Sequence, residues 1–67
     1  SCGARIRGLI EEGFFASPKK ADEVGERLKE KATPYEGKHV AAALIHTVQS
    51  GKLRRVKGEG VWAYVNP

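Results

Sequence analysis

Apolar residues recur at helical spacing in three stretches of the chain, and this spacing puts them on one face of each predicted helix. We expect a first helix over Ala4–Phe14, a second over Ala21–Lys31 and a third over Lys38–Ser50. The apolar faces that should form the core are Ile6, Leu9, Ile10 and Phe14, then Ala21, Val24 and Leu28, then Val40, Ala43, Leu44, Thr47 and Val48.

Proline and glycine mark the ends of these helices. Pro18 and Pro34 disfavour the α conformation in the residues before them, so a connector that could supply a short strand follows the first helix and a turn follows the second. Gly51 is in the usual position for a left-handed cap at the end of the third helix. Gly25, inside the second helix, costs about 1 kcal/mol relative to alanine. We interpret Gly25 as a place where another helix approaches closely.

Beyond the third helix, two β-prone runs predict a hairpin. Leu53–Lys57 and Val61–Val65 are separated by Gly58–Gly60, a connection of about the length that hairpins use. Trp62 and Tyr64 alternate with smaller apolar residues, so one of the two sets faces the core and the other faces outward. We assign both aromatic residues to the core, and base or partner stacking is the alternative.

The length of 67 residues allows one domain with one small core. Cys2 is the only cysteine, which excludes an internal disulfide, and no Cys/His cluster suggests a zinc site. No apolar run is long enough to span a membrane, and no apolar stretch at the N-terminus suggests a signal peptide. We therefore expect a cytoplasmic protein, nucleoid-associated or nuclear if it binds DNA. Because the chain starts at Ser1 and has no methionine, we expect residues 1–3 to be a tag remnant or a disordered fragment end and residues 4–67 to form the domain.

The charges are unevenly distributed. The chain has a formal net charge of +4, but the basic and acidic residues balance through Gly37. From Lys38 onward the cations face only Glu59. A basic hairpin beside an exposed helix is typical of a nucleic-acid binder, because neutralising phosphates releases condensed counterions. The cations of this second half are Lys38, Lys52, Arg54, Arg55 and Lys57.

The order of these elements resembles the winged helix-turn-helix superfamily over nearly the whole chain. The most similar string is Val40-x-x-Ala43-Leu44-x-x-x-Val48-x-x-Gly51-x-Leu53-x-Arg55, an ending common in recognition helices that lead into a wing. The resemblance implies an α+β, mainly α, fold with three helices and a C-terminal wing of two or three strands. It also implies that the third helix enters a DNA major groove and that the wing lies along the backbone or minor groove.

The outward face of the third helix carries side chains suited to base contact. Histidine and glutamine can hydrogen-bond base edges, and an alanine methyl can contact thymine. An ordinary solvated helix face is the alternative. A smooth apolar surface of Ala41, Ala42 and Ile45 would instead suit a protein partner or another part of a larger chain, although we expect Ile45 to be half-buried at the edge of the core. The candidate base-contacting residues are His39, Ala42, His46 and Gln49.

Phosphate contact is the role we expect for the basic residues of the wing, because such contacts fix register without reading sequence. A solvated charged hairpin is the competing interpretation. Lys19 and Lys20 precede the second helix, where backbone N–H groups attract anions, so they are candidates for a second phosphate contact or are solvated loop charges. The candidate phosphate-contacting residues are Lys19, Lys20, Lys38, Lys52, Arg54, Arg55 and Lys57.

No catalytic arrangement is apparent. The adjacent acids Glu11-Glu12 and Asp22-Glu23 diverge on a helix, whereas paired acid–base chemistry needs carboxylates that converge. His39 and His46 are two helical turns apart, too far for a simple shared metal site. We predict a non-enzymatic module, without cofactor or metal, that binds double-stranded DNA and acts in transcription regulation, alone or within a larger regulator. The alternative is a protein-interaction winged helix, and a monomer is the default because no extra helix is evident.

Overall fold

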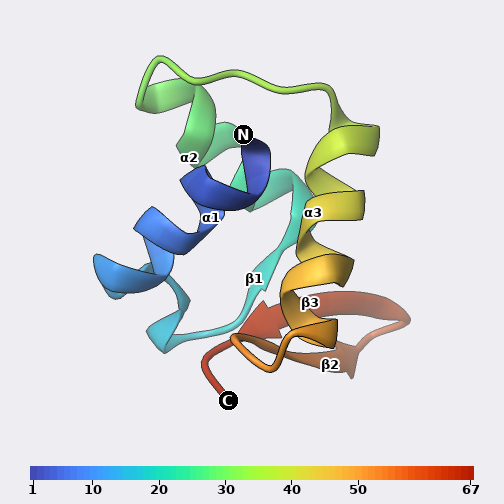
Figure 1. Cartoon of the computed structure of the whole chain (residues 1–67). Coiled ribbons are helices and arrows are strands. Elements are labelled where there is room, and N and C mark those ends of the chain that lie inside the picture. The colour runs from blue at the N-terminus through green and yellow to red at the C-terminus, as the bar shows by residue number, and fades with distance from the viewer.

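Three helices pack beside a small antiparallel sheet (Figure 1). This computed structural model describes residues 1–67. The mainly helical α+β class is confirmed, and the topology is consistent with a winged helix. The helices are α1 (Cys2–Glu11), α2 (Ala21–Glu30) and α3 (Gly37–Gln49), with a short 3-10 helix, η1 (Phe14–Ala16), after α1. The strands are β1 (Lys19–Lys20), β2 (Arg54–Gly58) and β3 (Val61–Val65), in the sheet order β1-β3-β2.

The first helix differs most from its predicted range at its C-terminal end. α1 ends at Glu11, and Gly13 then adopts a left-handed φ of 84°. The turn of η1 that follows directs Phe15 into the core, where it is 0% exposed. Phe14, which we expected in the core, is only partly buried and packs against the edge of it. The prediction of a continuous helix to Phe14 was therefore wrong.

The start of α1 also differs from the prediction. Ser1 Oγ accepts a hydrogen bond from the Ala4 backbone N–H at 3.3 Å, so the helix already includes Cys2. The other elements lie within a residue of their predicted bounds, and the connector before α2 does supply a short strand, β1. None of the helices combines the length and the apolar character needed to cross a membrane.

One core joins the three helices to the sheet. Most of the predicted apolar faces lie in it or pack against its margin. Thr47 is the one buried polar residue, and its hydroxyl donates to the Ala43 carbonyl at 2.7 Å. The core consists of Ile6, Leu9, Phe15, Val24, Leu28, Val40, Leu44, Leu53 and Tyr64.

Ion pairs between α1 and α2 neutralise much of the charge on that side of the molecule. Glu12 accepts a hydrogen bond from Lys31 and lies 3.6 Å from the guanidinium of Arg27. Arg27 also pairs with Glu30 at 3.1 Å. The hydrogen bond from Lys31 and the two positive charges lower the pKa of Glu12. These basic residues of α2 and its C-terminal cap are thus already engaged within the domain.

The second helix contains a glycine where alanine fits and is followed by an alanine where glycine fits. A Cβ at Gly25 would have no neighbouring heavy atom within 4 Å, so the predicted close approach of another helix was wrong. Ala32 follows the helix with a left-handed φ of 61°, and the Thr33 N–H donates back to the Leu28 carbonyl at 2.9 Å. This is the C-terminal cap in which glycine is normally favoured.

We expect Gly25→Ala and Ala32→Gly each to stabilise the fold by about 1 kcal/mol, the first through helix propensity and the second by relieving left-handed strain. Each should raise the melting temperature by roughly 4–8 °C in thermal unfolding followed by circular dichroism. Gly51→Ala is the matched control. Gly51 caps α3 with a φ of 81°, so this variant should lose about 1 kcal/mol of stability. Stabilisation by Gly51→Ala would contradict this account of the caps.

Candidate nucleic-acid interface

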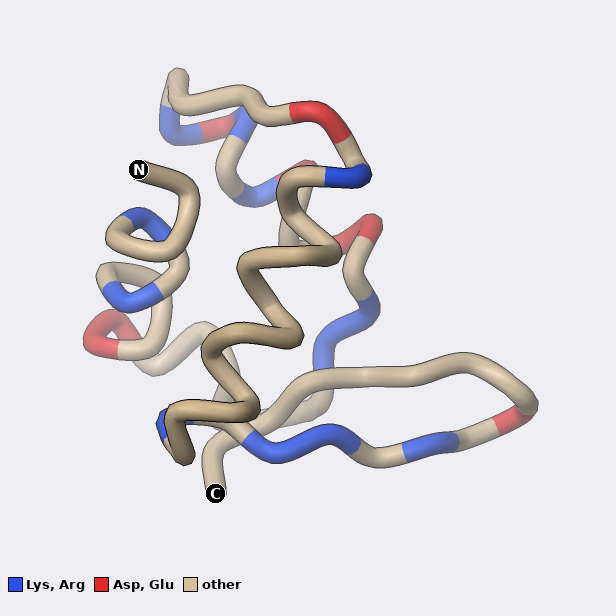
Figure 2. The backbone as a smooth tube through the Cα atoms, turned by 45° about the vertical axis from the view of Figure 1, so that its right-hand side comes forward, with Lys and Arg blue, Asp and Glu red and all other residues tan.

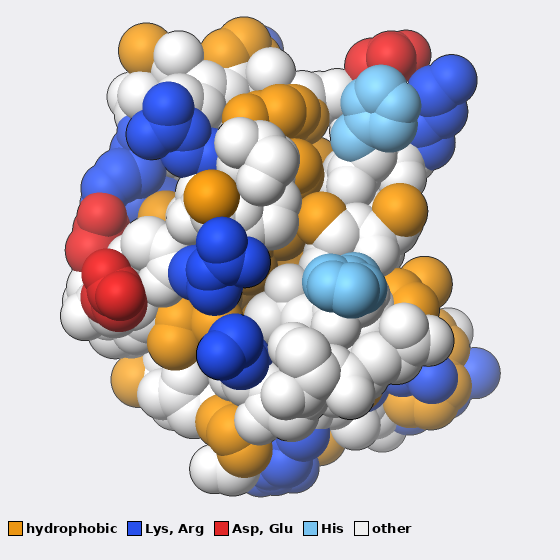
Figure 3. Space-filling view, viewed as in Figure 1, with side chains coloured by type: hydrophobic (Ala, Val, Ile, Leu, Met, Phe, Trp, Pro, Cys, Tyr) orange, Lys and Arg blue, Asp and Glu red, His pale blue; other side chains and the backbone are white.

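The side of α3 that faces away from the core is exposed along its length. Val40, Leu44 and Thr47 are buried on the inner side. His39 and His46 are exposed and lie two turns apart, about 10.5 Å along the axis. Figure 3 shows both histidine side chains on the same face of the molecule. The predicted base-contacting residues are all exposed: His39, Ala42, His46 and Gln49.

The exposed side of α3 carries almost no negative charge. Lys38 is exposed in its first turn, and no acidic residue occurs within the helix. Glu36, just before the helix, has a carboxylate oxygen 3.8 Å from Nδ1 of His39. Ile45 is 42% exposed, which agrees with the half-buried position that we expected. The face therefore offers hydrogen-bonding groups, one cation and an apolar contact.

Strands β2 and β3 form a hairpin that projects from the body of the domain beside α3 (Figure 2). Their pairing extends to Gly58 and Val61, so only two residues connect the strands. Glu59 and Gly60 both have positive φ, 54° and 78°, which is the combination of a type I′ turn. The connection is thus tighter than the three-residue link that we predicted, and it places a glutamate in a left-handed conformation.

We expect Glu59→Asn to stabilise the hairpin by roughly 0.5–1 kcal/mol, because asparagine tolerates the left-handed region better than glutamate does. Glu59 is also the only acid after Lys38, so the same change should raise affinity for an anionic partner. The measurements are thermal unfolding and binding to labelled DNA. Glu59→Gln removes the charge but keeps a long side chain in the turn, so it should raise affinity without stabilising. Equal stabilisation by both variants would contradict the turn argument.

The register of the hairpin separates its basic residues onto two faces. Arg55 lies opposite Tyr64 and Lys57 lies opposite Trp62, so these four share the face on which Tyr64 enters the core. Arg54 pairs with Val65 and belongs to the other face. The structure therefore brings Arg55 and Lys57 together and separates both from Arg54.

Trp62 is 41% exposed, so its assignment to the core was wrong. The Arg55 guanidinium carbon lies 4.0 Å from the centroid of the indole ring, and Lys57 Nζ lies 4.8 Å from it. Both distances are within the range of cation–π contacts, which hold a cation against the ring. Tyr64, two residues further along β3, is buried as predicted. Trp62 is thus a candidate site residue that its alternation with smaller residues had assigned to the core.

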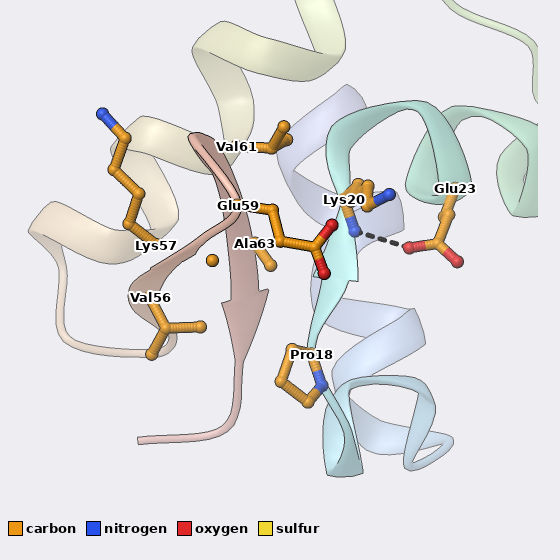
Figure 4. Close-up of a pocket in the computed structure, with 9 residues that line it drawn as sticks. Pro18, Lys20, Glu23, Val56, Lys57, Glu59, Val61 and Ala63 are labelled. Atoms are coloured by element: carbon orange, nitrogen blue, oxygen red, sulfur yellow. Dashed lines mark hydrogen bonds between the residues drawn. The ribbon is translucent and has the colours of Figure 1, made fainter.

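The opposite face of the hairpin has a different character (Figure 4). Val56, Val61 and Ala63 line a shallow hollow there, which Lys20 and the carboxylates of Glu23 and Glu59 border. The side chain of Lys57 extends away from this hollow in Figure 4. The two carboxylates outweigh the charge of Lys20 at the rim, so this face is less suited to a phosphate than the face of Trp62, which carries Arg55 and Lys57.

The remaining predicted phosphate contacts are dispersed. Lys19 Nζ donates to Ser17 Oγ at 2.7 Å and lies 5.1 Å from the ring centroid of Phe14, so this ammonium is engaged locally. Lys20 lies next to it at the start of α2, and its backbone N–H already donates to Glu23 at 2.8 Å. Lys52 is exposed between α3 and β2. Lys19 and Lys20 thus lie on β1, across β3 from the basic strand β2.

No group of three or more His, Cys, Asp or Glu side chains is placed to hold a metal ion. Cys2 is partly buried, and this burial raises the pKa of its thiol.

No protein-family model, curated protein or solved structure matches this chain. The function must therefore be inferred from the geometry of α3 and of the hairpin.

Proposed function

We propose that this domain is a non-enzymatic module that binds double-stranded DNA, with the exposed side of α3 in the major groove and the basic residues of the hairpin on phosphates. The observation that carries the proposal is the pairing of an exposed, acid-free helix with a projecting hairpin whose Arg55 and Lys57 share one face. An α-helix fits the major groove, and side chains on its outer side then reach base edges.

The distribution of charge supports this orientation. Arg27 of α2 and Lys31 just after it form ion pairs with acidic side chains, whereas β2 carries three cations and no acid. Figure 2 shows this contrast along the backbone, with the blue segments of β2 beside the largely uncharged length of α3. A duplex laid across α3 and the hairpin would meet positive potential and would avoid the acids of α1 and α2.

A rough salt dependence can be calculated from the number of cations on this side. Lys38, Lys52, Arg55 and Lys57 would together contact four phosphates if each makes one contact. The logarithm of the binding constant should then fall with the logarithm of salt concentration with a slope of about −3.6. If the exposed basic side chains only kept the protein soluble, no salt-dependent binding to DNA would be observed.

Protein binding through α3 is the second candidate function. Ile45 is 42% exposed and lies on the same helix as the exposed Ala42, so α3 has an apolar element that phosphate binding does not require. An interface built on that element would depend little on salt. The hairpin cations would then have no part in recognition.

The test is the change in amide NMR shifts of labelled protein on addition of a short mixed-sequence duplex, at low and at high salt. DNA binding as proposed should perturb residues 38–49 and 52–60 and lose those perturbations at high salt. No change in the spectrum at low salt would overturn the proposal. Perturbations confined to α1 and α2 would also overturn it, because the duplex would then lie on the wrong side.

A further inference from the structure

We propose that Trp62, with Arg55 and Lys57, forms a binding site for an unpaired nucleotide, whose base stacks on the indole while its phosphate contacts the cations. This inference rests on the proposed DNA-binding function and specifies the DNA: a duplex that ends in, or is interrupted by, an unpaired segment. The site lies on the face of the hairpin that Tyr64 shares.

The first support is that Trp62 is exposed without a structural need. The buried part of the hairpin ends at Tyr64, which is 5% exposed, and Trp62 lies one step further toward the turn. A tryptophan left 41% exposed beyond the buried part of the hairpin adds little to the core. Large amphipathic rings in such positions are typical of contact surfaces.

The second support is the arrangement around the ring. Arg55 and Lys57 approach it from β2, on one side of the central strand β3, at 4.0 and 4.8 Å from its centroid. On the other side of β3, Trp62 and Tyr64 border an open hollow of about 470 Å³ together with Lys20, Ala21 and Asp22. That volume is within the range of small-molecule sites, roughly 300–1,000 Å³. The ring thus stands between a pair of cations and an open hollow.

The chemistry of an unpaired nucleotide matches these elements. Every base has a flat π-face that stacks on an aromatic side chain, whereas a base inside a duplex is already stacked and presents only its edges. The phosphate that accompanies the base would be held by Arg55 and Lys57, which the indole keeps in place. Stacking of this kind is tolerant of base identity, so the site would recognise the unpaired state rather than a sequence.

The chain provides its own probe, because Trp62 is its only tryptophan. Intrinsic fluorescence and the anisotropy of labelled DNA would be recorded with three ligands: a short blunt duplex, the same duplex with an unpaired tail, and the tail strand alone. We expect the tailed duplex to bind roughly tenfold more tightly than the blunt one and to quench Trp62 more strongly. Trp62→Ala should abolish that tenfold preference, so that the tailed and blunt duplexes bind this variant equally, and Trp62→Phe should retain part of the preference.

The outcomes separate this inference from the proposed function. Equal affinity for blunt and tailed duplexes would overturn the nucleotide site and leave duplex binding intact. Quenching by the tail strand without any duplex binding would support the site and overturn the proposed function. Absence of binding to all three ligands would overturn both. Because the wild-type fluorescence reports on Trp62 directly, the test does not depend on the folding of the variants.

Discussion

Replacing Phe15 by alanine is expected to remove a large part of the stability of the domain. Phe15 is 0% exposed and is among the largest fully buried side chains. Its carbonyl also accepts a hydrogen bond from the Asn66 N–H at 2.9 Å, which ties the end of the chain to η1. Truncating a buried phenylalanine costs about 3–5 kcal/mol. A domain of this size has a total stability of roughly 3–10 kcal/mol, so the loss is a large part of the whole.

The adjacent residue provides the matched control for this prediction. Phe14 is only partly buried, and its ring meets that of Phe15 edge to face with centroids 5.2 Å apart. Phe14→Ala should therefore cost clearly less than Phe15→Ala in urea unfolding followed by circular dichroism. Similar losses for the two variants, or a larger loss for Phe14→Ala, would contradict the inward turn of η1 and would favour the continuous first helix that the sequence pattern predicts.

This pair of residues also marks the limit of what hydrophobic spacing can reveal. The helical period continues without a break from Ile6 to Phe14, and nothing in that period indicates that the helix stops at Glu11. The signal that was available is Gly13, which adopts the left-handed conformation on which the turn depends. The second and third helices were predicted nearly to the residue because Pro34 and Gly51 mark their ends clearly.

The faces of the hairpin were harder to predict for a different reason. Alternation along β3 correctly places Trp62 and Tyr64 on one face, but it does not show how far the helices extend over that face. Tyr64 lies under them and Trp62 lies beyond them, so only one of the two is buried. How far the helices extend over β3 depends on how the whole domain packs. The separation of Arg54 from Arg55, by contrast, follows from the same alternation and was available from the sequence.

The number and sign of the charged residues on α3 and the hairpin could be predicted from the sequence. The face on which each charged side chain lies could not. Counting residues from Lys38 onward is enough to find a basic half with a single acid. The count does not show that Lys19 is held by Ser17, or that Glu23 and Glu59 border the face opposite Trp62. Both facts depend on contacts that form only in the folded domain. Alternation separates Arg54, and the contacts with the indole ring then leave Arg55 and Lys57 as the candidate hairpin cations.

Reversing Arg55 and Lys57 together to glutamate is expected to weaken duplex binding roughly 100-fold at low salt. Each loses a charged hydrogen bond to phosphate of about 1.5 kcal/mol, or about 3 kcal/mol for the pair. The slope of log affinity against log salt should also become shallower by about 2, one unit for each lost phosphate contact. Both side chains are exposed, so the fold should be retained apart from the loss of the contacts with Trp62. Fluorescence anisotropy across a salt series measures both quantities.

The decisive control carries the same change of charge elsewhere. Arg5 and Arg7 lie on α1, which is on the other side of α3 from the tip of the hairpin in Figure 2. Reversing both to glutamate should reduce affinity only by a few-fold, through the change in the net charge of the domain. Arg54→Glu places one reversed charge on the opposite face of the hairpin and should have a smaller effect than Arg55→Glu. Equal losses in the α1 and hairpin variants would mean that binding follows net charge alone. Retention of full affinity by the hairpin variant would leave Ile45 and the apolar side of α3 as the surface to test next, against a protein partner.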